Sequence, residues 1–112
     1  MTLFEKIIAG EIPADIVFED EWCVAFRDIN PQAPTHVLIV PRKPVVNVAH
    51  ATSDDAELMG RVLLAAGEVA RHLGVEQGGY RLVFNNGAGA GQTVFHMHCH
   101  LLAGRPLTWP PG

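Results

Sequence analysis

The sequence predicts an α+β fold with a mainly antiparallel sheet of about five strands, one long helix and one short helix. Five segments have the alternating or clustered apolar residues of strands, and one long segment has helical periodicity. These strand-like segments do not alternate regularly with helices, as they do in parallel α/β folds. The 112 residues contain no low-complexity linker, so we expect one domain that covers residues 1–112.

The short helix and a β-hairpin are expected in the first quarter of the chain. Thr2 and Glu5 match the T-x-x-E capping box that precedes a first helical turn, and Gly10 is placed to end the helix. Residues 15–20 and 23–28 then alternate apolar and polar side chains and are separated by acidic residues that suit a turn. They predict two paired strands.

The third strand and the long helix occupy the middle of the chain. Residues 35–44 form a strand that ends at its prolines, because proline lacks the backbone donor of a ladder. Residues 53–74 predict the long helix, with Ser53 as its cap and Gly74 at its end. We expect its buried apolar stripe to consist of Ala56, Met59, Leu63, Ala66, Ala70 and Leu73.

The last two strands are expected at residues 80–86 and 93–103, on either side of the glycine-rich segment GAGAGQ. The tail that follows, RPLTWPPG, contains too much proline for regular structure. Its Trp109 is either an exposed rim residue or an anchor against another surface.

Charge and composition exclude several classes of partner. The net charge of −4 offers no basic surface for a nucleic-acid polymer or an anionic membrane, although one phosphate group needs only a local site. The longest apolar stretch is interrupted by Arg61 and Glu68, and the first residues lack the basic region of a leader peptide. Cys23 and Cys99 lie in apolar segments, where we expect buried, reduced thiols. We therefore expect a cytoplasmic protein.

Three of the six histidines stand at every second position in FHMHCHL, residues 95–101. An extended chain places His96, His98 and His100 on one face and the intervening apolar residues on the other. A helix would scatter the three rings. The sequence therefore predicts a row of imidazoles on one side of a strand.

Three interpretations of this row are open. The rings could be ordinary surface histidines, but strict alternation of three is improbable by chance. They could hold a catalytic zinc ion, yet Cys99 points to the opposite face and one flat strand does not easily converge three rings on one ion. The third interpretation, which we favour, is nucleophilic attack on phosphorus by a neutral imidazole, with the upstream glycines letting backbone amides approach an anion.

The motif HMHCHLL resembles the His-φ-His-φ-His-φ-φ signature of the histidine-triad (HIT) family, where φ is apolar. The segments FEKIIAGEIPADIVFEDEWCVAFRDINPQAPTHVLIVPRKP, GAGAGQTVFHMHCHLLAGR and WPPG resemble the Hint branch of that family. This resemblance implies a HIT-like fold and a homodimer that binds purine nucleoside monophosphates. It also implies hydrolysis of nucleoside 5′-phosphoramidates, such as adenosine phosphoramidate, without a metal or other cofactor.

The resemblance assigns catalytic roles to four histidines. His98 matches the nucleophile that attacks the α-phosphorus and forms a nucleotidyl-histidine, which water then hydrolyses. His100 matches the partner that contacts the phosphate and passes a proton to the leaving amine, and His96 supports the arrangement of the rings. His36, which we would otherwise interpret as a strand-edge residue, matches a fourth histidine near the triad. We expect the rate to fall as pH is lowered through the ordinary histidine pKa of about 6.5.

The resemblance also assigns nucleotide-binding residues. Asp28 matches the carboxylate that accepts both ribose hydroxyls, and Trp109 matches a residue that reaches the partner subunit's site. The apolar slot for the base is matched by Phe4, Ile8, Phe26 and Ile29, of which Ile8 and Phe26 are also open to interpretation as plain core residues. The phosphate site is matched by Asn85, Gln92, Thr93 and the backbone of Gly91.

Some residues depart from the family pattern and some functions stay open. Thr93 stands where a serine is common, and GAGAGQ lacks a frequent acidic residue. His50 and His72 match no functional position of the family. Within enzymes the alternative is a dinucleoside polyphosphate hydrolase or a nucleotidyl transferase. Outside enzymes it is a nucleotide-binding regulatory protein with vestigial activity.

Overall fold

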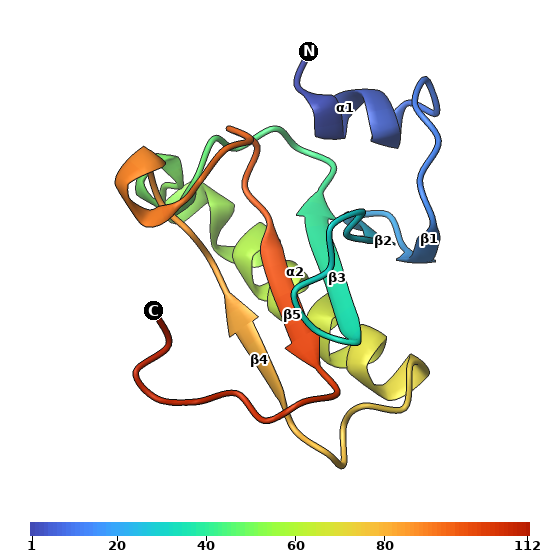
Figure 1. The fold of residues 1–112 in the computed structure, drawn as a ribbon. Coiled ribbons are helices and arrows are strands. Elements are labelled where there is room, and N and C mark those ends of the chain that lie inside the picture. Colours follow the sequence, from blue (N-terminus) through green and yellow to red (C-terminus); the bar gives the residue numbers. More distant parts are fainter.

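A computed structural model describes residues 1–112, in which five strands form one antiparallel sheet in the order β1-β2-β3-β5-β4. The long helix α2 packs against one face of the sheet, and the short helix α1 lies near its β1–β2 end (Figure 1). This arrangement confirms the predicted α+β fold. The helices and strands are α1 Leu3–Ile8, β1 Ile16–Glu19, β2 Cys23–Arg27, β3 Thr35–Pro41, α2 Ala56–His72, β4 Tyr80–Val83 and β5 Cys99–Ala103.

Strand alternation gives the sheet two different faces. Toward α2 it presents Cys23, Ala25, Val37, Ile39, Cys99 and Leu101, which belong to the larger core. Toward α1 it presents Val24, Phe26, Leu38 and Val40, which form a smaller core with Phe4 and Ile7. Leu38 of β3 pairs with His100 of β5, so the histidine row continues the face that α1 partly covers.

The capping box predicted for α1 is present. The Thr2 hydroxyl accepts a hydrogen bond from the Glu5 N–H, and the Glu5 carboxylate accepts one from the Thr2 N–H. Gly10 follows the helix with a φ of 79°, which glycine adopts without steric cost. The cap therefore fixes where Phe4 and Ile7, on one side of the helix, meet the sheet.

Helix α2 differs from the prediction at its start and in its buried face. Thr52, rather than Ser53, provides the capping box, which opens a 3₁₀ turn before the α-helix begins at Ala56. Leu63 is 52% exposed and Ala56 is exposed as well, so the expected stripe was wrong at these two residues. The buried face is turned by about one residue and consists of Leu58, Val62, Ala65, Ala66, Val69 and Ala70. Gly74 ends the helix with a φ of 72°, as expected.

The last strand is shorter than predicted because its partner ends at a proline. The β3–β5 ladder stops at the pair Ile39 and Cys99, and Pro41 has no N–H to continue it. Met97 instead donates its N–H to the Val45 carbonyl, 2.6 Å away. The alternation still holds through this segment, since Met97 joins the α2-side core together with Cys99.

Two further expectations concern the thiols and the membrane. Cys23 and Cys99 are both free and buried, and burial raises the pKa of each to about 12. Neither is a thiolate at neutral pH. The structure contains no helix with the length and apolar character needed to span a bilayer.

Candidate active site

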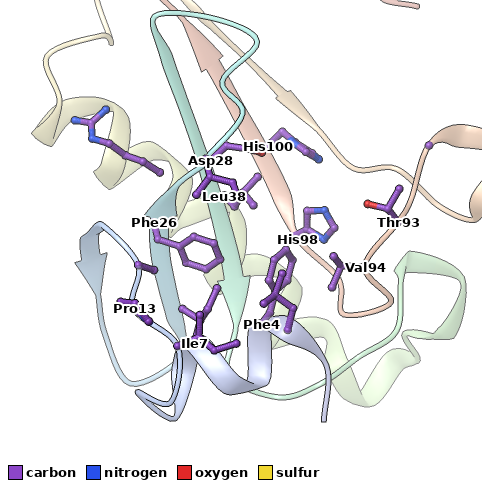
Figure 2. Close-up of a pocket in the computed structure, with 16 residues that line it drawn as sticks. Phe4, Ile7, Pro13, Phe26, Asp28, Leu38, Thr93, Val94, His98 and His100 are labelled. Atoms are coloured by element: carbon purple, nitrogen blue, oxygen red, sulfur yellow. The ribbon is translucent and has the colours of Figure 1, made fainter.

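A cavity of about 290 Å³ lies between α1, the α1-side face of the sheet and the loop before the histidine row. Figure 2 shows Phe4, Ile7 and Phe26 at one end and Asp28, Thr93, His98 and His100 at the other. The cavity therefore has an apolar end and a polar end, which suits a ligand with an apolar ring and a charged group. Its lining residues are Leu3, Phe4, Ile7, Ile12, Pro13, Ala14, Phe26, Arg27, Asp28, Ile29, Leu38, Gly91, Thr93, Val94, His98 and His100.

The tautomer of His98 is fixed by its own chain. Its Nδ1 lies 2.8 Å from the His96 carbonyl oxygen, which only accepts hydrogen bonds, so Nδ1 must carry the proton. The other nitrogen, Nε2, then holds a lone pair in the neutral ring. The Phe4 ring packs edge-on against the imidazole at a centroid distance of 4.9 Å. His98 is thus a firmly oriented ring in the cavity wall, with one nitrogen that forms no hydrogen bond within the protein.

A chain of hydrogen bonds orients His100. The Gln32 N–H donates to Nδ1 of His36 at 3.1 Å, so the neutral His36 ring carries its proton on Nε2. That Nε2–H faces Nδ1 of His100 at 2.9 Å. His100 therefore accepts at Nδ1 and keeps its own proton on Nε2. This leaves His100 as a hydrogen-bond donor in the wall of the same cavity.

His96 has a structural place behind the other two rings. It is fully buried, with Nε2 donating to the Pro41 carbonyl at 2.7 Å. Its Nδ1 accepts from the Thr2 hydroxyl at 3.3 Å. Both nitrogens are used inside the protein, and His96 does not line the cavity. It ties the cap of α1 to the end of β3 and offers its carbonyl to His98.

All four histidines are held in the neutral form at neutral pH. Burial is the largest cause that lowers the pKa of His36, His96 and His98 below the ordinary histidine value. The pKa of His100 falls to about 4, first through burial and then through the neighbouring His98 and His36. Asp28 opposes these shifts at three of the rings but does not reverse them.

Asp28 brings a carboxylate to the polar end of the cavity. One oxygen accepts the Asn30 N–H at 2.8 Å, and the other lies 3.5 Å from Nε2 of His36. The side chain keeps 19% of its surface exposed, so it can also accept hydrogen bonds from a ligand. Asp28 and the two histidines of the hydrogen-bond chain meet at one point.

That meeting point has the donor set of a metal site. The ligand atoms of Asp28, His36 and His100 lie within 4.8 Å of one another, and two imidazoles with a carboxylate suit zinc or a similar ion. However, the His36–His100 hydrogen bond needs a proton between the two nitrogens, which a metal would have to displace. The metal-free site therefore stays our prediction.

Thr93 supplies free donors opposite the histidines. Its side chain is exposed in the cavity wall, and neither its backbone N–H nor its hydroxyl forms a hydrogen bond within the protein. The N–H of the neighbouring Gly91 already donates to the Ala88 carbonyl at 3.0 Å. The Thr93 amide is therefore available to a ligand beside the histidines.

The structure brings together most of the residues that the sequence predicted for the site. The cavity is lined by Phe4, Phe26, Asp28, Ile29, Gly91, Thr93, His98 and His100, with His36 and His96 directly behind it.

Besides His36 and His96, four further predicted residues do not line the cavity. Ile8 packs against the smaller core, and the neighbouring Ile7 lines the cavity in its place. Gln92 is 3% exposed and turned toward the protein interior. Asn85 lies with Trp109, which is 84% exposed, in a separate surface depression beside β4.

Sequence reasoning missed other contributors. Leu38 could have been found, since it follows His36 by two residues on the same strand face. No local signal separates Ile7 from Ile8, because both stand at helical spacing from Phe4. The role of Thr2 as a partner of His96 joins residues 94 positions apart and has no local signal.

An antiparallel sheet that leads into an alternating row of three histidines beside a cavity of about 290 Å³ matches the histidine-triad class of fold. The chain belongs to the HIT family, because residues 9–107 match the HIT domain. It is 58% identical over 111 residues to an uncharacterized HIT-like protein of Synechocystis sp., covering 99% of this chain and 96% of that one.

Solved structures agree with this assignment. A HIT family hydrolase from Legionella pneumophila Philadelphia 1 is 53% identical, with a TM-score of 0.97 over 100% of both chains. A HIT family hydrolase from Clostridium thermocellum is 46% identical, with a TM-score of 0.93 over 96% of this chain and 93% of that one. The chain is therefore similar over nearly its whole length to two proteins named HIT family hydrolases.

Proposed function

We propose that this protein hydrolyses purine nucleoside 5′-phosphoramidates to a nucleoside monophosphate and an amine, through a nucleotidyl intermediate on His98. The observation that carries the proposal is the state of His98: Nδ1–H is bound to the His96 carbonyl, and the lone pair of Nε2 is left for the ligand. A neutral imidazole with an unengaged lone pair is the form that can attack phosphorus.

The cavity supports a nucleotide as the ligand. Its apolar end, which includes Phe4 and Phe26, suits a flat base. The exposed Ile29 at the edge of the cavity can cover the other face of that base. The Asp28 carboxylate suits two ribose hydroxyls, which donate to an acceptor-only group. The Thr93 donors and the Nε2–H of His100 suit the phosphate oxygens. The lining therefore offers groups suited to a base, a ribose and a phosphate.

The chemistry proceeds in two displacements. Nε2 of His98 forms a bond to the α-phosphorus while the P–N bond of the substrate breaks, and the amine leaves with one added proton. Water then attacks the phosphorus and the bond to His98 breaks. One proton of that water replaces the proton that the amine took. We assign this proton transfer to His100: the negative charge of a bound phosphate raises its low pKa, the ring takes up a second proton from solvent, gives one to the leaving amine and recovers one from the attacking water.

The test of this mechanism is the variant His98→Ala. It is expected to abolish turnover of adenosine phosphoramidate and to keep AMP binding measurable by calorimetry, because the base and ribose contacts lie elsewhere. His72→Ala, on the exposed end of α2, is the matched control and should keep normal turnover. Near-normal turnover by His98→Ala would exclude the proposed nucleophile.

A direct search for the intermediate completes this test. Enzyme quenched during turnover of a slowly released analogue should carry one nucleotidyl group on the peptide that contains His98, as detected by mass spectrometry. An adduct on another residue would reassign the nucleophile.

The leaving group separates the alternatives. If dinucleoside polyphosphates are better substrates than any phosphoramidate, the protein is a polyphosphate hydrolase. If the nucleotidyl group is transferred to an acceptor other than water, it is a nucleotidyl transferase. Uniformly negligible rates with all leaving groups would favour a nucleotide-binding regulatory protein. We expect the phosphoramidates to have the highest kcat/KM.

We also propose a cytoplasmic homodimer. Leu63 and Leu64 are exposed on α2 by 52% and 64%, and Trp109 lies in a surface depression with residues of the edge strand β4. Such exposed apolar groups suit a subunit interface.

The buried reduced thiols suit a reducing compartment, which supports the cytoplasmic location. Light scattering should give twice the 12.1 kDa chain mass, and Trp109→Ala should lower turnover if the tail reaches the partner's site.

A further inference from the structure

The loop before the histidine row is a separate structural unit. Residues 88–90 form a 3₁₀ turn that the chain closes on itself, with the N–H groups of Ala90 and Gln92 both donating to the Gly87 carbonyl at 3.1 Å. The loop brings Gly91 and Thr93 into the cavity wall. Its position relative to the sheet therefore decides where the free donors of Thr93 lie.

Gln92 anchors this loop with every hydrogen-bonding group of its carboxamide. The oxygen accepts from the Gly87 N–H at 2.8 Å and from Nδ2 of Asn47 at 3.1 Å. The nitrogen donates to the carbonyls of Val46 at 2.8 Å and Val94 at 3.1 Å. A carboxamide has two donors and two acceptor positions, so Gln92 has none left for a phosphate.

Asn47 holds the other side of this anchor. Its side chain is 5% exposed, between Gln92 and the surface. Its oxygen lies 2.7 Å from Nδ1 of His50, which donates to it and so fixes which end of the carboxamide faces Gln92. The Ala49 N–H donates to the Asn86 side chain at 2.8 Å, which adds a second link between the two segments.

Figure 1 shows these two segments side by side, the orange turn near residue 90 next to the green chain near residue 50. The hydrogen bonds at Asn47 and Asn86 bridge 45 and 37 residues of sequence. A buried network in which each member is satisfied holds one geometry, because any shift leaves polar groups unpaired.

We propose that Asn47 is a positioning residue for the reaction: through Gln92 it holds loop 86–94 so that Thr93 faces the phosphate beside His98. Gln92 acts through the same contacts and is itself a positioning residue. His50, which matches no family function, orients Asn47 from the surface. This inference rests on the proposed function and deepens it, because it names the residues that build the phosphate end of the site.

The experiment compares variants of Asn47 and His50. Asn47→Asp keeps the shape and the acceptor for His50 but replaces the donor to Gln92 with an oxygen. His50→Ala removes the orienting donor at an exposed position, so it tests the network where folding is not at risk. Gln77→Glu, in the exposed turn after α2, is the control for the added negative charge.

The measurements separate loop positioning from general damage. Asn47→Asp should lower kcat for adenosine phosphoramidate roughly 10- to 100-fold, because small displacements of a phosphate-contacting group are costly. It should weaken AMP binding and leave adenosine binding unchanged, since adenosine lacks the phosphate. His50→Ala should shift the same quantities in the same direction by less, and Gln77→Glu should shift none of them.

NMR tests the position of the loop by itself, because this readout does not depend on activity. The backbone amide signals of Gly87 and Gly91 in the NMR spectrum should move or broaden in Asn47→Asp and His50→Ala. If these signals stay unchanged, or if the loop loosens while kcat and the AMP affinity hold, the proposal is overturned. Equal loss of adenosine and AMP binding in His50→Ala would also overturn it.

The failure of the proposed function would look different. A wild-type protein that neither turns over the phosphoramidate nor binds AMP would remove the reaction. Unchanged amide signals in His50→Ala, with wild-type turnover intact, would remove the positioning role and keep the reaction.

Discussion

Each ring of the histidine row has a different set of partners, although the motif presents them as equivalents. His96 uses both nitrogens inside the protein, His98 uses only Nδ1, and His100 accepts at Nδ1 from a fourth histidine. Backbone carbonyls set two of these states. Because a carbonyl can only accept, the protonated nitrogen of each ring follows from the fold.

The pH dependence of the rate tests the neutral state of His98. Burial lowers its pKa, so the neutral nucleophile persists below the ordinary histidine value and the rate should fall only at more acidic pH. We expected the rate to decline near pH 6.5, but a pKa of about 6.5 belongs to a solvated ring. The burial of His98 corrects that expectation toward lower pH. A profile of kcat/KM between about pH 4 and about pH 8 measures it.

A fall in kcat/KM with an apparent pKa at or above the ordinary histidine value would contradict this assignment. The variant His50→Ala, at the surface, should keep the same acid limb even where its overall rate is lower.

Removal of metal ions tests the hydrogen-bonded pair at the Asp28 end of the cavity. We expect turnover to be unchanged after dialysis against EDTA, because the His36–His100 contact holds a proton rather than an ion. Elemental analysis of the purified protein should find less than one equivalent of zinc. A stoichiometric ion, lost together with activity in His36→Gln, would show that a metal takes the place of that proton.

At the scale of elements, the strands were predicted better than the helix face. Alternation in residues 95–101 placed the rings correctly, because a period of two allows only two faces and one of them was wholly apolar. In α2, leucine and valine occur on several sides, and Leu63 and Leu64 are exposed beside the buried Val62. Composition alone could not select the face that meets the sheet.

The loop residues show why part of the site could not be predicted. Gln92 matches a phosphate-site position by resemblance, yet two of its four side-chain hydrogen bonds come from Asn47 and Val46, 45 and 46 residues away. The partner of a side chain in a long-range network depends on the packed fold. No local pattern reports it.

The turn after β5 offers a test of backbone geometry. Gly104 has a φ of 95°, and a Cβ there would lie 2.9 Å from the Cβ of Pro34. Gly104→Ala should lower the free energy of unfolding by about 1–3 kcal/mol, from backbone strain and the clash together. Urea unfolding measures this change.

Gly10→Ala is the matched control for that prediction. Its φ of 79° carries the same kind of backbone strain, but a Cβ there meets nothing within 4 Å. Its loss of stability should be smaller than that of Gly104→Ala. Equal losses would mean that the contact with Pro34 does not affect the free energy of unfolding.

At the scale of the whole molecule, the site belongs to no single element. The cavity takes its apolar end from α1 and the neighbouring strands, its carboxylate from the segment after β2 and its donors from the loop before β5. A resemblance to the family predicted this assembly, since it carries the fold with it. The residues alone predicted the row and its chemistry.

The stability of the whole protein should depend on pH through the buried histidines. His36, His96, His98 and His100 have lowered pKa values in the folded protein, whereas unfolded rings titrate at about 6.5. Between the lowered and the ordinary values the unfolded chain binds more protons, so stability rises with pH there. Lowering the pH from about 7.5 to about 5 should therefore reduce Tm.

Calorimetry across that pH range checks the sign. The variant His100→Gln removes one of the four groups and should make the dependence shallower. A Tm that rises as the solution becomes more acidic would contradict the neutral state of these rings.

The complete burial of His96 has a chemical consequence. An acylating reagent such as diethyl pyrocarbonate needs an accessible imidazole lone pair, and this ring has both nitrogens engaged and no exposed surface. Carbethoxylation of the native protein should therefore mark His98, whose Nε2 lone pair is unengaged, and spare His96. His100 should react slowly, because its Nδ1 lone pair already accepts from His36. The reagent would single out the middle one of three rings that the motif writes with the same letter.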